Sequence, residues 1–314
     1  MKTTYLYAFL GILLMVFTGC TDNETTEAGV GRLTIQLTDA PFPLDLISEA
    51  NVTIYKIEAR QKNDTEYDSS MEDEETMNDE SEDMHDGNAI VVLMEEEISV
   101  NLLDLTNGMT ESLVDTEIPA GTYDQLRVYA KGINVVMNDE EGTTYDLKIP
   151  SGEQSGIKIK IKPALTIVGG LSADLLLDFD VSRSFVPRGN IRNMSKFNGF
   201  IFKPVIKVSN MATAGTLAGV VTDMADGTVL EGAQITVSQN GEEITSSFTD
   251  ETGAYMIMGL DPGDYDVFAS IELPTSEEED APTELYASPE ESISIVVGNK
   301  TVRNFELDLT MPEL

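Results

Sequence analysis

The stretch DLLLDFDVS, residues 174–182, alternates apolar and polar side chains. Successive side chains of an extended chain point to opposite faces, so this alternation predicts a β-strand with one buried and one solvated face. The apolar face carries Leu175, Leu177, Phe179 and Val181, and the polar face carries Asp174, Asp178, Asp180 and Ser182. The carboxylates of Asp178 and Asp180 are therefore expected on the same side of the strand, about 6.5–7 Å apart.

The same pattern extends to both sides of this stretch. It recurs in RLTIQLTD (32–39), NVTIYKIEAR (51–60), QLRVYA (125–130) and GIKIKIK (156–162). Turn-forming sequences separate the alternating segments, namely TNGM (106–109), PAGTY (119–123), NDEEG (138–142) and PSGEQSG (150–156). Helical periodicity is weak, and a short helix is expected at most over 44–50 or 103–113. Residues 31–208 are predicted to form a β-sandwich.

The composition changes at SNMATAGT (209–216), which is small and polar and is predicted to be a linker. Seven shorter alternating segments follow it. Short strands at this spacing are typical of an antiparallel sandwich with Greek-key connections, here over residues 217–310. The predicted fold class is therefore all-β, with two tandem antiparallel β-sandwiches.

The amino-terminal residues predict a signal peptide. Lys2 precedes a 13-residue uncharged run, residues 5–17, which is shorter than the roughly 20 residues that span a bilayer. Small residues follow, and then Cys20, the only cysteine of the chain. Residues 1–19 are the predicted signal peptide, so the predicted sandwiches lie behind it.

Residues around Cys20 resemble a bacterial lipobox, in which the cysteine is acylated after cleavage, although Phe17 departs from the usual Leu. The alternative is an ordinary signal peptide followed by a free thiol. The resemblance implies lipidation of Cys20 and anchoring to a membrane, with residues 20–30 as a tether. Thr21 after the cysteine favours the outer membrane, by similarity to sorting signals. The expected location is the outer membrane, facing the periplasm or the cell surface.

The charge excludes several partners. The chain has 19 basic and 56 acidic residues, a net charge of −37, so it repels nucleic acid and anionic lipid surfaces. Acidic residues concentrate in 64–86, within a predicted insertion over 62–88 that also holds the only histidine, His85. Such blocks are typical of solvated loops. A loose divalent-cation sponge is the alternative, because the block lacks the spacing of an ordered calcium loop.

Two resemblances to known families rest on longer stretches. Residues 215–237 (GTLAGVVTDMADGTVLEGAQITV) and 245–270 (TSSFTDETGAYMIMGLDPGDYDVFAS) resemble the carboxypeptidase regulatory-like domain, a transthyretin-like sandwich that is also grouped with carbohydrate-binding-like folds. Tyr255 and Tyr265 are expected to be core or corner tyrosines of that sandwich and not ligand platforms.

The first sandwich resembles a family of bacterial lipoprotein domains of unknown function. The resemblance rests on GRLTIQLTDAP (31–41), SVNLLDLTNG (99–108), IPAGTYDQLRV (118–128), LLLDFDVSRSF (175–185) and FKPVIKV (202–208). It brings no activity with it.

Candidate chemistry is limited to carboxylates. The chain has one histidine and one cysteine, too few for a zinc site built on these residues. A catalytic nucleophile–histidine pair would need the only histidine, His85, which lies in the acidic insertion. Asp178 and Asp180 are the candidate ligands of a hard cation such as Ca²⁺, since oxygen ligands suit it. No other cofactor is expected. The spacing of Asp178 and Asp180 also suits the two carboxylates of an inverting glycosidase, so a carboxylate-based hydrolase stays as a remote alternative.

The expected function is non-enzymatic: a cell-envelope lipoprotein for binding, adhesion or scaffolding, with an envelope protein or a glycan as partner. The alternative is a carbohydrate-binding accessory lipoprotein of a glycan-uptake system. It rests on the fold grouping alone, and the chain has no tryptophan to serve as a sugar platform.

Overall fold

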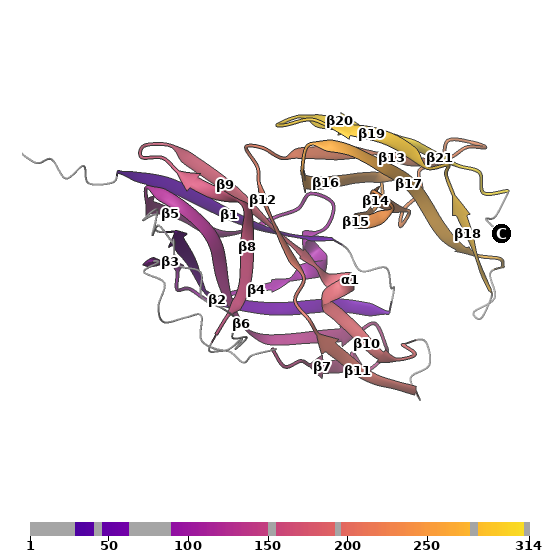
Figure 1. Cartoon of the computed structure of the whole chain (residues 1–314). Helices are drawn as coiled ribbons and strands as arrows, with labels where there is room; N and C mark the ends of the chain where they lie inside the picture. Colours follow the sequence, from indigo (N-terminus) through magenta and orange to yellow (C-terminus); the bar gives the residue numbers. More distant parts are fainter. Residues whose placement is uncertain are drawn as a thin grey trace, which may run out of the picture.

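The computed structural model describes residues 29–40, 46–62, 89–149, 155–191, 196–276 and 282–310. These residues form two β-sandwiches that lie against each other (Figure 1), which confirms the predicted all-β fold class. The predicted signal peptide, Cys20, and almost all of the acidic insertion with His85 lie outside the described residues. Within the described ranges, no helix has the length and apolar character needed to cross a bilayer.

The first sandwich has two main sheets. One has the strand order β12-β9-β1-β5, and the other has the order β3-β2-β6-β7, with β4 also paired to β2 and β8 to β6. The strands of the first sheet are β1 (Val30–Ala40), β5 (Glu111–Pro119), β9 (Ser172–Asp180) and β12 (Ile206–Asn210). Those of the second are β2 (Ile47–Lys62), β3 (Ala89–Met94), β4 (Ile98–Asn101), β6 (Gly121–Met137), β7 (Thr144–Asp146) and β8 (Ile157–Ile167).

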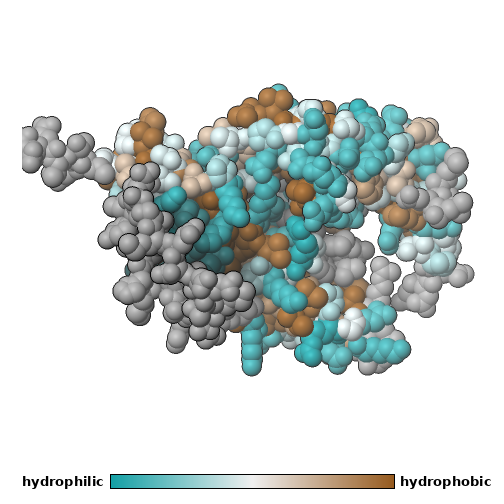
Figure 2. Space-filling view, viewed as in Figure 1, coloured by the Kyte–Doolittle hydropathy of each residue, from teal (hydrophilic) through white to brown (hydrophobic). Residues whose placement is uncertain are grey.

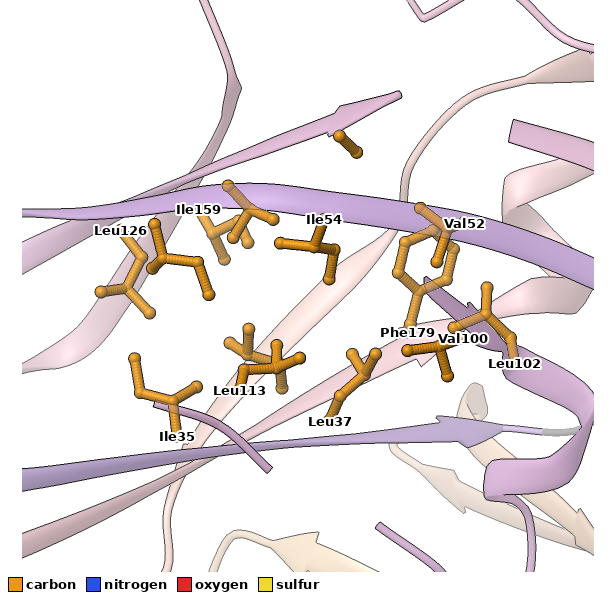
Figure 3. Close-up of a cluster of buried hydrophobic side chains, with 14 of the residues drawn as sticks. Ile35, Leu37, Val52, Ile54, Val100, Leu102, Leu113, Leu126, Ile159 and Phe179 are labelled. Carbon is orange, nitrogen blue, oxygen red and sulfur yellow. The ribbon is translucent and has the colours of Figure 1, made fainter. Parts of the chain in front are cut away.

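The core of the first sandwich lies between these sheets, as the alternation predicts. Ile35 and Leu37 of β1 point toward Val52 and Ile54 of β2 (Figure 3), and all four side chains are at most 2% exposed. A hairpin of β10 (Phe185–Gly189) and β11 (Phe197–Phe202) extends the core with packed phenylalanine rings. Burying apolar side chains on one face of each strand is the main stabilising contribution to such a fold.

The short helices differ from the expectation. Residues 102–105 form a 3-10 helix, η1 (Leu102–Leu105), but β5 begins at Glu111, so the predicted helix over 103–113 is wrong beyond its first turn. Residues 47–50 belong to β2, so a helix over 44–50 is wrong as well. A single helical turn, α1 (Val181–Ser184), follows β9.

The sheets are mainly antiparallel, as predicted, but β1 (Val30–Ala40) pairs with β9 in parallel, and so does β13 (Gly215–Asp223) with β20 (Lys300–Val302) and β21 (Phe305–Leu307) in the second sandwich. In the register of β1 and β9, Thr38 lies beside Asp178, and Ala40 lies beside Asp180. The carboxyl ends of two strands that are far apart in the sequence therefore meet at one end of the sheet.

The second sandwich also has two sheets. One has the order β16-β13-β20 with β21 paired to β13, and the other has the order β15-β14-β17-β18 with β19 paired to β17. The first contains β13 (Gly215–Asp223), β16 (Ala254–Leu260), β20 (Lys300–Val302) and β21 (Phe305–Leu307). The second contains β14 (Gln234–Gln239), β15 (Glu242–Phe248), β17 (Gly263–Pro274), β18 (Thr283–Ala287) and β19 (Glu291–Ile295).

Each sandwich has its own buried tyrosine corner. The Tyr265 hydroxyl donates a 2.8 Å hydrogen bond to the carbonyl of Asp261, and the Tyr123 hydroxyl donates one of the same length to Pro119. Tyr255 is 2% exposed and its hydroxyl donates to the carbonyl of Arg303. The prediction that Tyr255 and Tyr265 are core or corner residues is confirmed.

The connection between the sandwiches is shorter than the predicted linker over 209–216. β12 continues to Asn210 and β13 begins at Gly215, which leaves four residues, 211–214, between them. The carbonyl of Asn210 accepts hydrogen bonds from the amides of Thr213 and Ala214, so a tight turn joins the two domains.

Candidate functional site

The two sandwiches meet at the open side of the second one. β15 and β16 are the end strands of their sheets, and both face the first sandwich. Unpaired carbonyls on an edge strand need hydrogen-bond donors, and an uncovered edge can pair with another chain. The first sandwich therefore covers a surface that would otherwise be exposed.

Four side chains of the first sandwich donate hydrogen bonds to carbonyls of these edge strands. Their donor–acceptor distances are 3.2 Å for Arg183 Nη2 to Ile244 O, 3.1 Å for Asn107 Nδ2 to Ala254 O, 3.3 Å for Lys207 Nζ to Gly259 O, and 2.6 Å for Ser209 Oγ to Gly259 O. The donors come from η1–β5, α1 and β12, so several elements hold the second sandwich in one orientation.

Glycines allow close approach at this contact. Gly108 has a φ of +81°, and a Cβ there would stand 2.7 Å from Met256 Sδ. Gly259 has a φ of +74°, and a Cβ there would stand 3.0 Å from Ser209 Oγ and 3.2 Å from Leu176 Cδ2. A larger residue at Gly108 would therefore strain the turn and require the Met256 side chain to move.

The polar face of β9 is covered by this contact. Leu176, which lies on the same face as Asp178, is 1% exposed, and Asp180 is 6% exposed. The expectation of a solvated acidic face therefore holds at Asp174, which is exposed, and is wrong at the carboxyl end of β9, where a second domain packs and both faces are covered. Period-two alternation alone gives no information about a docked neighbour.

A small cavity lies at the centre of the junction. Thr38, Asp39 and Asp178 line it from the first sandwich, and residues 245–247 and 256–258 line it from the second. About 20 Å³ of it is open to water-sized molecules, which is enough for one water molecule or one ion.

Asp39 is the most buried carboxyl group at the cavity, with 6% of the residue exposed. Its Oδ1 accepts a 3.1 Å hydrogen bond from the amide of Val181, and its Oδ2 has no partner among the described residues. Burial raises the pKa of Asp39 well above its ordinary value; the Val181 amide lowers it, and the charges of Asp178 and Asp180 raise it further.

Asp178 is partly buried and lies beside Lys207 in the antiparallel register of β9 and β12. Burial, and then the charge of Asp180, raise its pKa to about 6, while Lys207 and Arg183 act in the opposite direction. The cavity therefore holds two carboxyl groups that both resist ionisation.

Asp180 has a different role. Its side chain caps α1 by accepting from the amide of Arg183, and it also accepts from the Ser182 hydroxyl and the Arg183 guanidinium. These contacts satisfy an N-terminal amide of the turn and pair the charge. The cavity is therefore lined by Asp39 and Asp178 on the side opposite the second sandwich, and Asp180 is not among the lining residues. The assignment of Asp178 and Asp180 as metal ligands stays a prediction.

Asp39 was missed by the sequence analysis, although a signal for it exists. It continues the buried face of β1, two residues after Leu37, where a solvated acid is not expected. Within the described part of the chain, no group of three or more His, Cys, Asp or Glu side chains has the geometry of a metal site. Any ion in the cavity would therefore depend on two carboxylates and on hydroxyl or backbone oxygens.

Four of the stretches on which the resemblance of the first domain rests meet at this junction, and residues 99–108 contribute Asn107 and Gly108 to it. Asp39 is the second-last residue of β1, residues 178–180 end β9, and Val205 directly precedes β12. The amide of Asp180 donates a 3.0 Å hydrogen bond to the carbonyl of Val205, and the amide of Val205 donates a 2.8 Å bond to the Ser184 hydroxyl. These stretches build the surface on which the second sandwich docks.

The fold and the junction define a protein of two tandem β-sandwiches docked directly on each other. The family model described as a domain of unknown function (DUF4382) matches residues 30–204, more than half of the chain, and the chain therefore belongs to this family. The carboxypeptidase regulatory-like domain model matches residues 216–308. Both matches confirm the resemblances found in the sequence.

No curated protein matches the chain. Among solved structures, it is similar to the minor pilin of Streptococcus agalactiae, with 12% identity over 90% of this chain and 98% of that chain and a TM-score of 0.22. It is also similar to the major pilin subunit of Bacillus cereus, with 12% identity over 89% and 70% and a TM-score of 0.25. The shaft pilin of Lactobacillus rhamnosus has 10% identity over 91% and 99%, with a TM-score of 0.24. At such scores the fold assignment depends on the strand arrangement described above.

Proposed function

We propose that the protein is a non-enzymatic, lipid-anchored envelope module that presents its two sandwiches as one rigid unit to a partner protein. The observation that carries this proposal is the docked junction. A four-residue connection and four side-chain hydrogen bonds to edge-strand carbonyls hold the domains together. A fixed arrangement lowers the entropic cost of binding a partner across both domains.

The carboxyl groups support a non-enzymatic role. An inverting glycosidase needs a general acid and a general base on either side of a bound sugar. Asp180 is instead bonded to Arg183, and the cavity beside Asp178 has room for a water molecule or an ion but not for a sugar ring. The hydrolase alternative therefore lacks space for its substrate at these residues.

The anchor is part of the proposal. Cys20 lies nine residues before the first described residue, Gly29, so a tether between them reaches at most about 30–35 Å when extended. With Cys20 acylated, the first sandwich would stay close to the outer membrane and the second would extend from it.

Apolar turns offer contact points on this unit. Figure 2 shows a mainly polar face with apolar patches over the β8–β9 turn and over the β19–β20 turn. Val168 and Leu171 are 51% and 61% exposed in the first turn, and Val296 and Val297 are 53% and 52% exposed in the second. Small apolar patches with a polar surround are common in protein contact surfaces.

The glycan-binding alternative requires exposed aromatic rings, which supply an apolar stacking surface. All seven tyrosines in the described ranges are buried or half-buried. Tyr55 and Tyr129 form the half-exposed ring pair of the second sheet, and Lys131 and Lys56 lie over their rings at 5.6 Å. A protein partner therefore suits the described surface better than a glycan.

The test is cross-linking on intact cells that produce the anchored protein, with photoreactive residues at Leu171 and Val297. We expect adducts with an envelope protein at one or both positions, and none at the control position Glu96, which is exposed between β3 and β4 of the first sandwich. Gel retardation by envelope polysaccharide, without protein adducts, would favour the glycan alternative and contradict the proposal.

A second measurement tests the rigid unit. Without Cys20 the chain has no cysteine, so spin labels can be placed at Glu117→Cys and Glu290→Cys in a soluble form that starts at residue 21. We expect one narrow distribution of label distances, which the Asn107→Ala, Ser209→Ala double variant should broaden. A broad distribution in the unaltered junction, measured with divalent cations present, would show that the domains move independently.

A further inference from the structure

Among the described residues, two that line the cavity, one from each sandwich, each carry a buried oxygen atom that has no hydrogen-bond partner. Asp39 Oδ2 belongs to a residue that is 6% exposed, and Ser247 Oγ belongs to one that is 2% exposed. Buried polar atoms in folded proteins nearly always have a partner, because an unpaired one loses its hydration without replacement. Something that occupies the cavity would satisfy both atoms at once.

The charges around the cavity indicate what that occupant is. Within the described ranges, no Lys or Arg nitrogen lies within ion-pairing distance of the carboxyl group of Asp39 or Asp178. The two nearby cations are used elsewhere: Arg183 pairs with Asp180, and Lys207 bonds to the carbonyl of Gly259. The cavity therefore has an excess of negative charge when its carboxyl groups are ionised.

We propose that the cavity binds one hard divalent cation of the calcium class, held by the carboxylates of Asp39 and Asp178 and by the hydroxyl of Ser247. All three donors are oxygens, which such a cation prefers, and the volume fits one ion. Because the donors come from both sandwiches, the cation fastens the end of the β1–β9 pair to β15.

The donor set also predicts how tightly the cation binds. Two carboxylates are few for a calcium site, and the remaining ligand positions go to neutral oxygens and water. Sites with few charged ligands bind calcium with dissociation constants of about 0.1–1 mM, the range of extracellular modules. Such a site would be filled outside the cytoplasm and empty inside it.

The test uses the soluble protein that starts at residue 21, at pH 7.5, after treatment with EDTA. Isothermal titration and the thermal midpoint are measured with CaCl₂ and with NaCl of the same ionic strength. We expect a calcium-specific rise in the midpoint and a dissociation constant of about 0.1–1 mM. Asp39→Asn, Asp178→Asn and Ser247→Ala should each weaken the specific binding, the two carboxylate variants by about tenfold or more.

The acidic insertion requires a matched control, because many carboxylates bind calcium loosely. Glu117→Gln removes one exposed negative charge from the first sandwich and should keep the specific response. Asp39→Asn keeps an oxygen for the Val181 amide; if it still fails to fold, Asp178→Asn and Ser247→Ala decide the outcome.

Two results would overturn the inference. Equal midpoint shifts with calcium and matched sodium would mean charge screening alone. A calcium-specific response that survives in Asp178→Asn and Ser247→Ala would place the ion outside the junction. The distribution of distances between the spin labels on the two domains gives an independent readout. In the native sequence this distribution should broaden when calcium is removed. An unchanged distribution would also contradict a bridging ion.

Discussion

Replacing Asp178 by Asn should stabilise the protein at neutral pH in calcium-free buffer. In the folded chain the pKa of Asp178 is about 6, above its ordinary value of 3.8, because the group is buried and lies near the charge of Asp180. Between these two pH values the folded state binds more protons than the unfolded state. The free energy of unfolding therefore falls as pH rises from about 4 to 6 and stays low above that.

The charged groups that face Asp178 set the size of this effect. Asp180 at the end of β9 opposes its ionisation, and Lys207 on β12 and Arg183 on α1 favour it. The charge of Asp178 in turn raises the pKa of Asp39 on β1. The hydroxyl and methionine residues of β15 and β16 at the cavity are neutral. A shift of about two pKa units corresponds to roughly 3 kcal/mol, and the partial exposure of Asp178 reduces this to about 1.5–3 kcal/mol.

The assay is thermal and urea unfolding of the soluble protein in EDTA at several pH values between 3.5 and 8. At pH 7.5 the Asn variant should melt about 3–12 °C above the native sequence, given roughly 2–4 °C per kcal/mol for a domain of this size. Below pH 4 the two should converge. Glu117→Gln reports the effect of net charge alone. Parallel pH profiles for Asp178→Asn and the native sequence, or a variant that is less stable at pH 7.5, would refute this account of the junction.

Three further predictions concern other parts of the chain. Tyr123→Phe and Tyr265→Phe should each lower the free energy of unfolding by about 0.5–1.5 kcal/mol, because each removes one corner hydrogen bond. Urea titrations measure this change, and an unchanged free energy would show that the corner bonds contribute nothing. Cys20→Ser should leave the protein unprocessed or release it from outer membranes, as fractionation of cells would show, and membrane retention of a processed Ser variant would contradict lipidation. Deleting residues 63–86 should change the thermal midpoint little or raise it slightly, because loop length affects closure entropy slowly and clustered charges repel; a fall of more than about 10 °C would mean that the segment packs.

Much of the architecture could be predicted from the sequence, because burial of one strand face requires a period of two. The apolar faces of β1 and β9 are buried where the alternation places them, at Leu37 and Leu177 for example. Tyr255 and Tyr265 were expected in the core or at a corner of the second sandwich, and the structure confirms it.

The pairing of the strands could not be predicted in the same way. Alternation is identical in parallel and antiparallel strands, so nothing in residues 32–39 or 174–182 shows that β1 and β9 run in the same direction. That direction brings Asp39 and Asp178 to the same end of the sheet. A pairing of the opposite sense would place the carboxyl ends of the two strands at opposite ends of the sheet.

The second face of β9 shows the same limit of local patterns. Asp174, Leu176 and Asp178 look like the solvated side of a strand, and a single leucine among acids is not a strong signal. Leu176 is nevertheless buried, because β16 of the second sandwich packs on it near Gly259. Burial between domains depends on contacts that no segment of a few residues encodes.

The cavity follows from the way in which the second sandwich is closed. The open side between β15 and β16 exposes carbonyls, and the first sandwich covers them with side chains that donate hydrogen bonds. Asn107, Arg183 and Ser209 reach the edges of the gap from its two sides, and the ends of β1 and β9 face its centre. At that centre the first sandwich supplies carboxyl groups, which accept hydrogen bonds, and the second supplies the hydroxyl of Ser247, which has no partner in the described part of the chain. Apolar residues there would close the junction without a ligand, whereas two carboxylates leave it dependent on protons or on a cation. The stability of the docked unit should therefore respond to its ionic surroundings far more than either apolar core does.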